Sequence, residues 1–224
     1  FNRLGKRFEL PEILLDILMI FNFVPGRHES IVAAGWTIGV EMIYYLLLPV
    51  LLVMIRGVWH SIAFALLGIF VGALVRSQLV AGGGVLQQYA SFSFLSWLGV
   101  FALGFTAFEL YRHGQAMNDT ARRSLIIKIA VVTSALFSAL AFRMFDCLIG
   151  IAWRPDVLLW ALLFAALIAW QAIAPSRILS ATPFQFVGER SFGIYLIHPF
   201  VIVCLTHVNK DLYAKAAHSI GDGA

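Results

Sequence analysis

The sequence predicts an all-α fold, a polytopic bundle of about six transmembrane helices in a single domain, and three observations lead to it. Hydrophobic residues make up 61% of the 224 residues and charged residues only 12%, a share well below that of a soluble domain. The mean hydropathy of +0.88 leaves too little polar surface for a soluble domain of this size. Apolar runs long enough to cross a bilayer core also recur along the chain. Helices are expected throughout, because an open sheet edge would leave unpaired backbone groups in hydrocarbon.

The expected elements follow one another between turn-forming residues. A short run at 10–24 is interrupted by Glu12, Asp16 and Asn22, so it predicts an interfacial or half-crossing helix in a leading segment, residues 1–33. Arg56-Gly57 separates the first two full spans, the triple glycine at 82–84 precedes the third, and Pro175 follows the fifth. The six predicted spans are residues 34–55, 58–75, 92–111, 125–145, 155–174 and 188–207, followed by a tail at 208–224.

Lys and Arg residues in the loops predict the orientation. The loop at 112–123 carries Arg112, Arg122 and Arg123, so it is expected on the cytoplasmic side, with residues 27–35 outside. Arg76 is assigned to a loop on the outer side. Within the spans, the pairs Gly35/Gly39 and Gly68/Gly72 are spaced for close helix approach, although glycine is also simply tolerated in membrane helices.

Two ionisable residues stand inside predicted spans, where a charge costs on the order of 2.5–3.5 kcal/mol and therefore marks a functional candidate. Glu41 lies seven residues into its span, about 10 Å deep at the helical rise. It is a candidate general base, a candidate partner that orients a histidine, or half of a structural ion pair.

His198 lies near the middle of the last span, directly before Pro199. Proline lacks an N–H, so it frees a backbone carbonyl next to the imidazole. A histidine that only hydrogen-bonds across the bundle is the competing interpretation. Tyr45 and Tyr195 are placed to offer hydroxyls to either ionisable residue, or to serve as core aromatics.

Other chemistry is disfavoured. The net charge of +4 is expected to reflect basic membrane loops, not a nucleic-acid partner. Cys147 and Cys204 suggest no disulfide framework, and no metal site, phosphate-binding loop or dinucleotide fingerprint is present in the sequence. No bound cofactor is expected.

The two ionisable residues lie in segments that resemble motifs of the acyltransferase-3 family of membrane acyltransferases. The first runs from Trp36-Thr37 through Glu41 and Tyr44-Tyr45-Leu46 to Pro49, similar to the family's W-S-L-x-x-E-x-x-F/Y-Y-L-x-x-P. The second runs from Gly188 through Ser191-Phe192 and Tyr195-Leu196 to His198-Pro199, similar to G-x-x-S-Y-x-x-Y-L-x-H-x-P, with Phe for the first Tyr and proline directly after the histidine. The resemblance covers residues 8–207, and the spans between the motifs match in hydropathy alone.

The resemblance implies a multi-pass enzyme of a bacterial inner or plasma membrane that transfers an acyl group, often acetyl, from acyl-CoA (acetyl-CoA) to a hydroxyl of a surface glycan or glycolipid, as in O-acetylation of polysaccharides. It implies Glu41 as the catalytic residue, with Trp36, Thr37, Tyr45, Ser191, Tyr195 and His198 in supporting or substrate-binding roles. The family also has an essential arginine–histidine motif in its first spans. The chain begins at Phe1, after that region, so a partial domain that is inactive alone is expected.

Two other functions remain open. In a secondary transporter, Glu41 and His198 would form a proton relay along a substrate path. No internal duplication is visible in the sequence, which disfavours that function. A membrane sensor or scaffold is the third possibility, favoured if the intact protein also lacks the upstream histidine.

Overall fold

The computed structural model describes residues 9–28, 30–31, 35–148, 151–202 and 204–206. Within these ranges every regular element is helical and no strand occurs, which confirms the predicted all-α class. Residues 1–8 of the predicted leading segment, His207 and the predicted tail at 208–224 lie outside the described residues.

Five helices are long and apolar enough to cross a membrane. They are α2 (Gly35–Met54), α3 (Val58–Ala81), α5 (Leu98–Ala116, preceded by the 3-10 turn η2 at Phe94–Trp97), α6 (Asp119–Ala141) and α7 (Pro155–Ile173). At 1.5 Å per residue, helices of this length extend over about 30 Å, the thickness of a bilayer core. Each overlaps one predicted span. Helices α3 and α5 continue further toward their C-termini than predicted, and α6 begins and ends earlier than the predicted span 125–145.

The sixth predicted span is bent. It consists of α8 (Thr182–Glu189) and a helix over Ser191–Thr206, which meet at an angle of 70°. Arg190 between them has φ −104° and ψ 3°, outside helical geometry, and its guanidinium carbon lies 3.7 Å from the centre of the Phe186 ring. The predicted span at 188–207 therefore corresponds to the helix over Ser191–Thr206, and the bend falls at its start, so that Gly188 of the second motif lies at the end of α8.

The shorter elements lie mostly at the ends of the bundle. The leading apolar run contains α1 (Leu10–Ile17), which has a capping box between Glu9 and Glu12 and is too short to cross a bilayer. Its apolar side chains Leu10 and Ile17 are about 70% exposed, as expected of a helix at an interface. The others are η1 (Phe21–Phe23), α4 (Gly84–Tyr89) and η3 (Asp146–Leu148).

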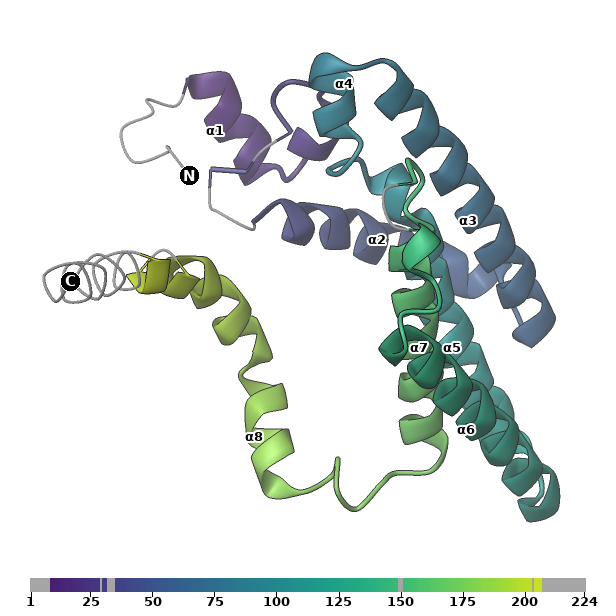
Figure 1. Cartoon of the computed structure of the whole chain (residues 1–224). Coiled ribbons are helices and arrows are strands. Elements are labelled where there is room, and N and C mark those ends of the chain that lie inside the picture. The colour runs from purple at the N-terminus through teal and green to yellow at the C-terminus, as the bar shows by residue number, and fades with distance from the viewer. Residues whose placement is uncertain (1–8, 29, 32–34, 149–150, 203, 207–224) are drawn as a thin grey trace, which may run out of the picture.

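Helix α5 is the centre of the bundle (Figure 1). It packs against α3 and against α7, and α7 packs against α6. Small residues at these contacts let the helices approach closely: Ala65 meets Ala102 between α3 and α5, while Ala107 and Ala169 lie in the cluster that α5 shares with α6 and α7. Helix α8 and the helix that follows it stand apart from this packed group.

Four glycines mark close approaches between segments. A Cβ on Gly68 or Gly72 of α3 would lie 3.2 Å from a backbone carbonyl oxygen of the η2–α5 segment, and one on Gly99 of α5 would lie 2.9 Å from the Cα of Ile69. A Cβ on Gly39 of α2 would lie 2.5 Å from the side chain of Asn22. The close approach predicted at Gly68 and Gly72 is confirmed, whereas Gly39 packs against the side chains of Phe21 and Asn22 in η1 (Phe21–Phe23).

Candidate functional site

The first motif occupies the N-terminal half of α2. Thr37, Glu41 and Tyr45 are separated by four residues each, so they lie along one face of the helix. The Glu41 side chain is partly exposed, and within the described part of the chain it makes no hydrogen bond or ion pair. The interpretation of Glu41 as half of a structural ion pair therefore finds no partner among the described residues.

The second motif lies beyond the bend, where Ser191, Tyr195 and His198 share a face of the 191–206 helix. Pro199 cannot donate to the carbonyl oxygen of Tyr195 four residues earlier, and the Nδ1 atom of His198 bonds that oxygen instead. A carbonyl only accepts, so Nδ1 carries the proton and a neutral ring presents Nε2 as an acceptor. The freed carbonyl that the sequence predicted beside the imidazole is confirmed.

The two motifs meet at one pair of side chains. The hydroxyl of Thr37 on α2 and the hydroxyl of Tyr195 on the last helix share a hydrogen bond across 158 positions of sequence. Glu41 follows Thr37 by one helical turn, and His198 follows Tyr195 by three residues with 5.1 Å between the Tyr195 and His198 ring centres. The structure gives no direct contact between Glu41 and His198 among the described residues. The exposed Ser191 likewise makes no hydrogen bond there.

Trp36 is held by an aromatic cluster at the start of α2. Its ring centre lies 5.1 Å from that of Phe92 and 6.1 Å from that of Trp97. The indole nitrogen of Trp97 in turn donates to the carbonyl oxygen of Ser91 at 3.0 Å. The cluster ties the first motif to the segment between α4 and α5.

Asn22 fixes the same end of α2 from the other side, and its side chain is completely buried. With its amide turned by 180°, Nδ2 donates to the carbonyl oxygen of Phe92 and Oδ1 accepts from the backbone N–H of Val40 at 2.9 Å, so both amide atoms are satisfied. The backbone carbonyl of Asn22 accepts from the hydroxyl of Tyr89 at 2.6 Å. Burial raises the pKa of that hydroxyl.

An apolar cavity of about 390 Å³ lies beside the first motif, between α2, α3 and α5. Tyr44 and Tyr45 both line it. The hydroxyl of Tyr44 is already engaged, since it donates to the carbonyl oxygen of Phe94 at 2.7 Å, while its ring stacks on Phe101. The Tyr45 hydroxyl makes no hydrogen bond within the described residues, and the side chain is 57% exposed. Of these two tyrosines, Tyr45 is the one whose hydroxyl is available to a substrate.

A family model described as "Acyltransferase domain" matches residues 8–218, nearly the whole chain. The chain belongs to the acyltransferase-3 family. It is thus a membrane acyltransferase, and its apolar helices indicate a multi-pass membrane protein. No curated protein and no solved structure matches it.

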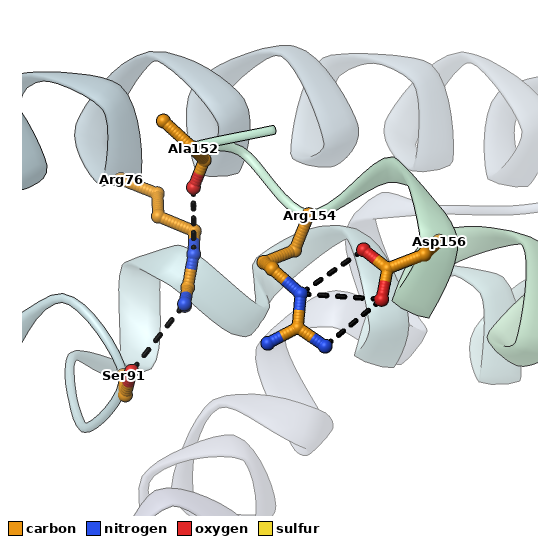
Figure 2. A network of polar contacts seen from close by, with 5 residues as sticks. All are labelled: Arg76, Ser91, Ala152, Arg154 and Asp156. Atoms are coloured by element: carbon orange, nitrogen blue, oxygen red, sulfur yellow. Dashed lines mark hydrogen bonds and ion pairs between the residues drawn. The ribbon is translucent and has the colours of Figure 1, made fainter. Parts of the chain in front are cut away.

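Sequence reasoning missed a buried cation in this acyltransferase. Because α3 continues to Ala81, Arg76 lies inside the helix, only 8% exposed, and not in the outer loop to which it was assigned. Its guanidinium donates to the carbonyl oxygens of Ala152 (2.9 Å) and Ala90 (3.0 Å) and to the hydroxyl of Ser91 (3.3 Å). Figure 2 shows Arg76 between these segments, near the ion pair of Arg154 and Asp156. The apolar residues 79–81 after Arg76 were the available signal.

Glu109 is the second such residue in the acyltransferase. It lies near the C-terminal end of α5 and is only 3% exposed. Its carboxylate accepts from the backbone N–H of Gly57 (3.1 Å) and pairs with Arg112 (2.8 Å). Glu109 therefore fastens the α2–α3 turn to α5. The spacing of Glu109 and Arg112 by three residues was the signal for the pair.

Proposed function

We propose that this acyltransferase moves an acyl group, acetyl in the first instance, from acyl-CoA to a hydroxyl of a surface glycan or glycolipid, at the inner or plasma membrane. The observation that supports this most is the hydrogen bond between Thr37 and Tyr195, because it joins the helix that carries Glu41 to the helix that carries His198. In this proposal, the face of α2 that carries Glu41 and the face of the last helix that carries His198 line the same active site.

Glu41 is the proposed general base. A sugar hydroxyl is a weak nucleophile, so its proton must pass to a base within hydrogen-bond reach as it attacks. The carboxylate of Glu41 takes that proton, the acceptor oxygen bonds to the thioester carbon, and the carbon–sulfur bond breaks to release CoA. In support, Glu41 is partly exposed and has no partner among the described residues that would compete for the proton.

The hydroxyls of Tyr45 and Tyr195 are the proposed donors to the thioester oxygen, on which negative charge develops during attack. Tyr45 also lines the apolar cavity beside α2, which suits the hydrocarbon part of an acyl donor. Trp36, Thr37 and Ser191 are proposed to position the acceptor. His198, with Nε2 as an acceptor, is proposed to support the substrate and not to replace the base.

The test is Glu41→Gln in the intact protein in membranes, with acyl transfer measured from labelled acetyl-CoA. We expect a loss of at least about a hundredfold, the lower range for removing a general base, with unchanged membrane levels. Glu189→Gln is the matched control, because Glu189 is 73% exposed and lies at the end of α8. Activity that survives Glu41→Gln would remove Glu41 from the proposed role.

A further inference from the structure

A second cavity lies on a different face of α5 from the proposed site. Its volume is about 240 Å³, and it is lined by residues of α5, α6 and α7. On α5 it uses Leu103, Thr106, Ala107 and Leu110, whereas the cavity beside α2 uses Phe101, Gly104, Phe105 and Phe108. Its other lining residues are Lys128, Ile129, Val132, Leu162, Ala165 and Ala166. Lys128 is the one charged side chain of this lining.

Lys128 lies within the apolar part of α6. It is the tenth residue of a helix that begins at Asp119, about 14 Å along the axis at the helical rise. It makes no hydrogen bond or ion pair with any described residue. A lysine in a membrane helix is costly unless it meets an anion or extends its ammonium to the interface along an apolar stem.

The shape and place of the cavity indicate what fills it. It lies among membrane-spanning helices and its walls are apolar, so hydrocarbon fills it more favourably than water. From Leu110 to Leu103 it extends over about 10 Å of helix, long and narrow enough for a hydrocarbon chain. A helix, at about 10 Å in diameter, is too wide for such a volume.

The charged residues near the cavity indicate which lipid head group is bound. Lys128 is the first of the three α6 residues that line the cavity, and Arg122 and Arg123 lie outside this lining, one to two turns nearer the start of the same helix. Arg122 is paired with Asp119 at 3.0 Å, whereas the structure gives Lys128 and Arg123 no anionic partner among the described residues. An uncompensated cation beside a hydrocarbon-filled cavity is complementary to a phosphate on a hydrocarbon chain.

We propose that the cavity between α5, α6 and α7 is a binding site for an anionic phospholipid, with one acyl chain in the cavity and the phosphate at Lys128. The proposal does not depend on the transfer reaction. It makes the lipid a bound component of the bundle, at the contact through which α6 and α7 pack on α5.

The test uses the purified intact protein in detergent, with native mass spectrometry to compare retention of phosphatidylglycerol and zwitterionic phosphatidylcholine. We expect a preference for phosphatidylglycerol that falls about fivefold in Lys128→Gln, in line with the loss of one interfacial cation, and that persists in Lys128→Arg. Arg123→Gln is the matched control, since it removes the same charge from the same helix outside the cavity. Lys128→Met serves as the second charge-removing change if Lys128→Gln is poorly produced.

A pair of variants with larger side chains tests whether a lipid acyl chain occupies the cavity. Ala166→Leu narrows the cavity and is expected to weaken retention of both lipids, whereas Ala135→Leu adds the same bulk on the exposed face of α6 and is expected to change neither. Equal phosphatidylglycerol preference in wild type and both charge-removing variants would overturn the proposal. So would unchanged lipid retention in Ala166→Leu.

Discussion

Thr37 and Tyr195 share a hydrogen bond between their side-chain hydroxyls, although 158 positions separate them. The bond connects α2, whose Tyr44 ring stacks on Phe101 of α5, with the last helix, which otherwise stands apart from the packed group. The placement of His198 relative to Glu41 therefore depends on a polar contact more than on helix packing. Removing the contact should affect transfer more than folding.

Thr37→Val and Tyr195→Phe each remove one hydroxyl of this bond with little change in shape. A hydrogen bond of this kind contributes on the order of 1 kcal/mol, so each change should lower kcat/KM for acyl transfer about fivefold or more. Tyr195→Phe also removes a proposed donor to the thioester oxygen, so it should be the worse single variant. The double variant should be no worse than Tyr195→Phe alone, because Thr37→Val removes only the bond that Tyr195→Phe has already removed. Thr206→Val, on the exposed side of the same helix, is the control. Losses that multiply in the double variant would show that the two hydroxyls act independently.

Gly99 and Gly104 on α5 offer a matched pair for the packing. A Cβ on Gly99 would lie 2.9 Å from the Cα of Ile69, a backbone atom that cannot turn away, whereas one on Gly104 meets no atom within 4 Å. Gly99→Ala should force α3 and α5 apart and lower the free energy of unfolding by about 1–3 kcal/mol. Gly104→Ala should be neutral or stabilising, because alanine is the better helix former. Denaturation in mixed micelles measures both, and equal effects would contradict the close approach.

The sequence predicted the spans well because the length of an apolar run is a local property that the bilayer constrains directly. Glu41 and His198 were found by the same reasoning, since an ionisable residue inside such a run is conspicuous. Arg76 and Glu109 escaped because they lie near span ends, where composition does not distinguish a solvated charge from one enclosed by neighbouring segments.

Contacts between segments far apart in the sequence could not be predicted in this way. Residue spacing tells which side chains share a face of one helix, so it could group Thr37 with Glu41 and Tyr195 with His198. It carries no information on how two helices turn toward each other, and the Thr37–Tyr195 bond is decided by that rotation. The break at Arg190 was also hidden, because the apolar residues continue on both sides of it.

Glu109 should stabilise the end of the bundle where α2 turns into α3. Glu109→Ala leaves the N–H of Gly57 without its acceptor, and we expect a loss of about 1–3 kcal/mol in the free energy of unfolding. Glu109→Gln keeps an acceptor for Gly57 and should lose less. Limited proteolysis at the turn containing Arg56 gives a local readout, and Glu189→Ala is the exposed control. A turn equally resistant in wild type and Glu109→Ala would argue against this role.

Arg76 should matter far more for stability than its neighbour Arg154. Arg76→Met removes the donors to the carbonyl oxygens of Ala90 and Ala152 and to the hydroxyl of Ser91, groups that hold α3 to the segments before α5 and α7. We expect a loss of about 3 kcal/mol, typical of breaking a buried hydrogen-bonded group. Arg154→Met breaks an ion pair whose arginine is 46% exposed, which is worth at most about 1 kcal/mol. Denaturation of both variants in mixed micelles measures the free energy of unfolding. Similar losses in the two variants would mean that the Arg76 contacts contribute no more than a surface ion pair. A clearly larger loss in Arg76→Met identifies Arg76 as the residue that fastens this end of the bundle.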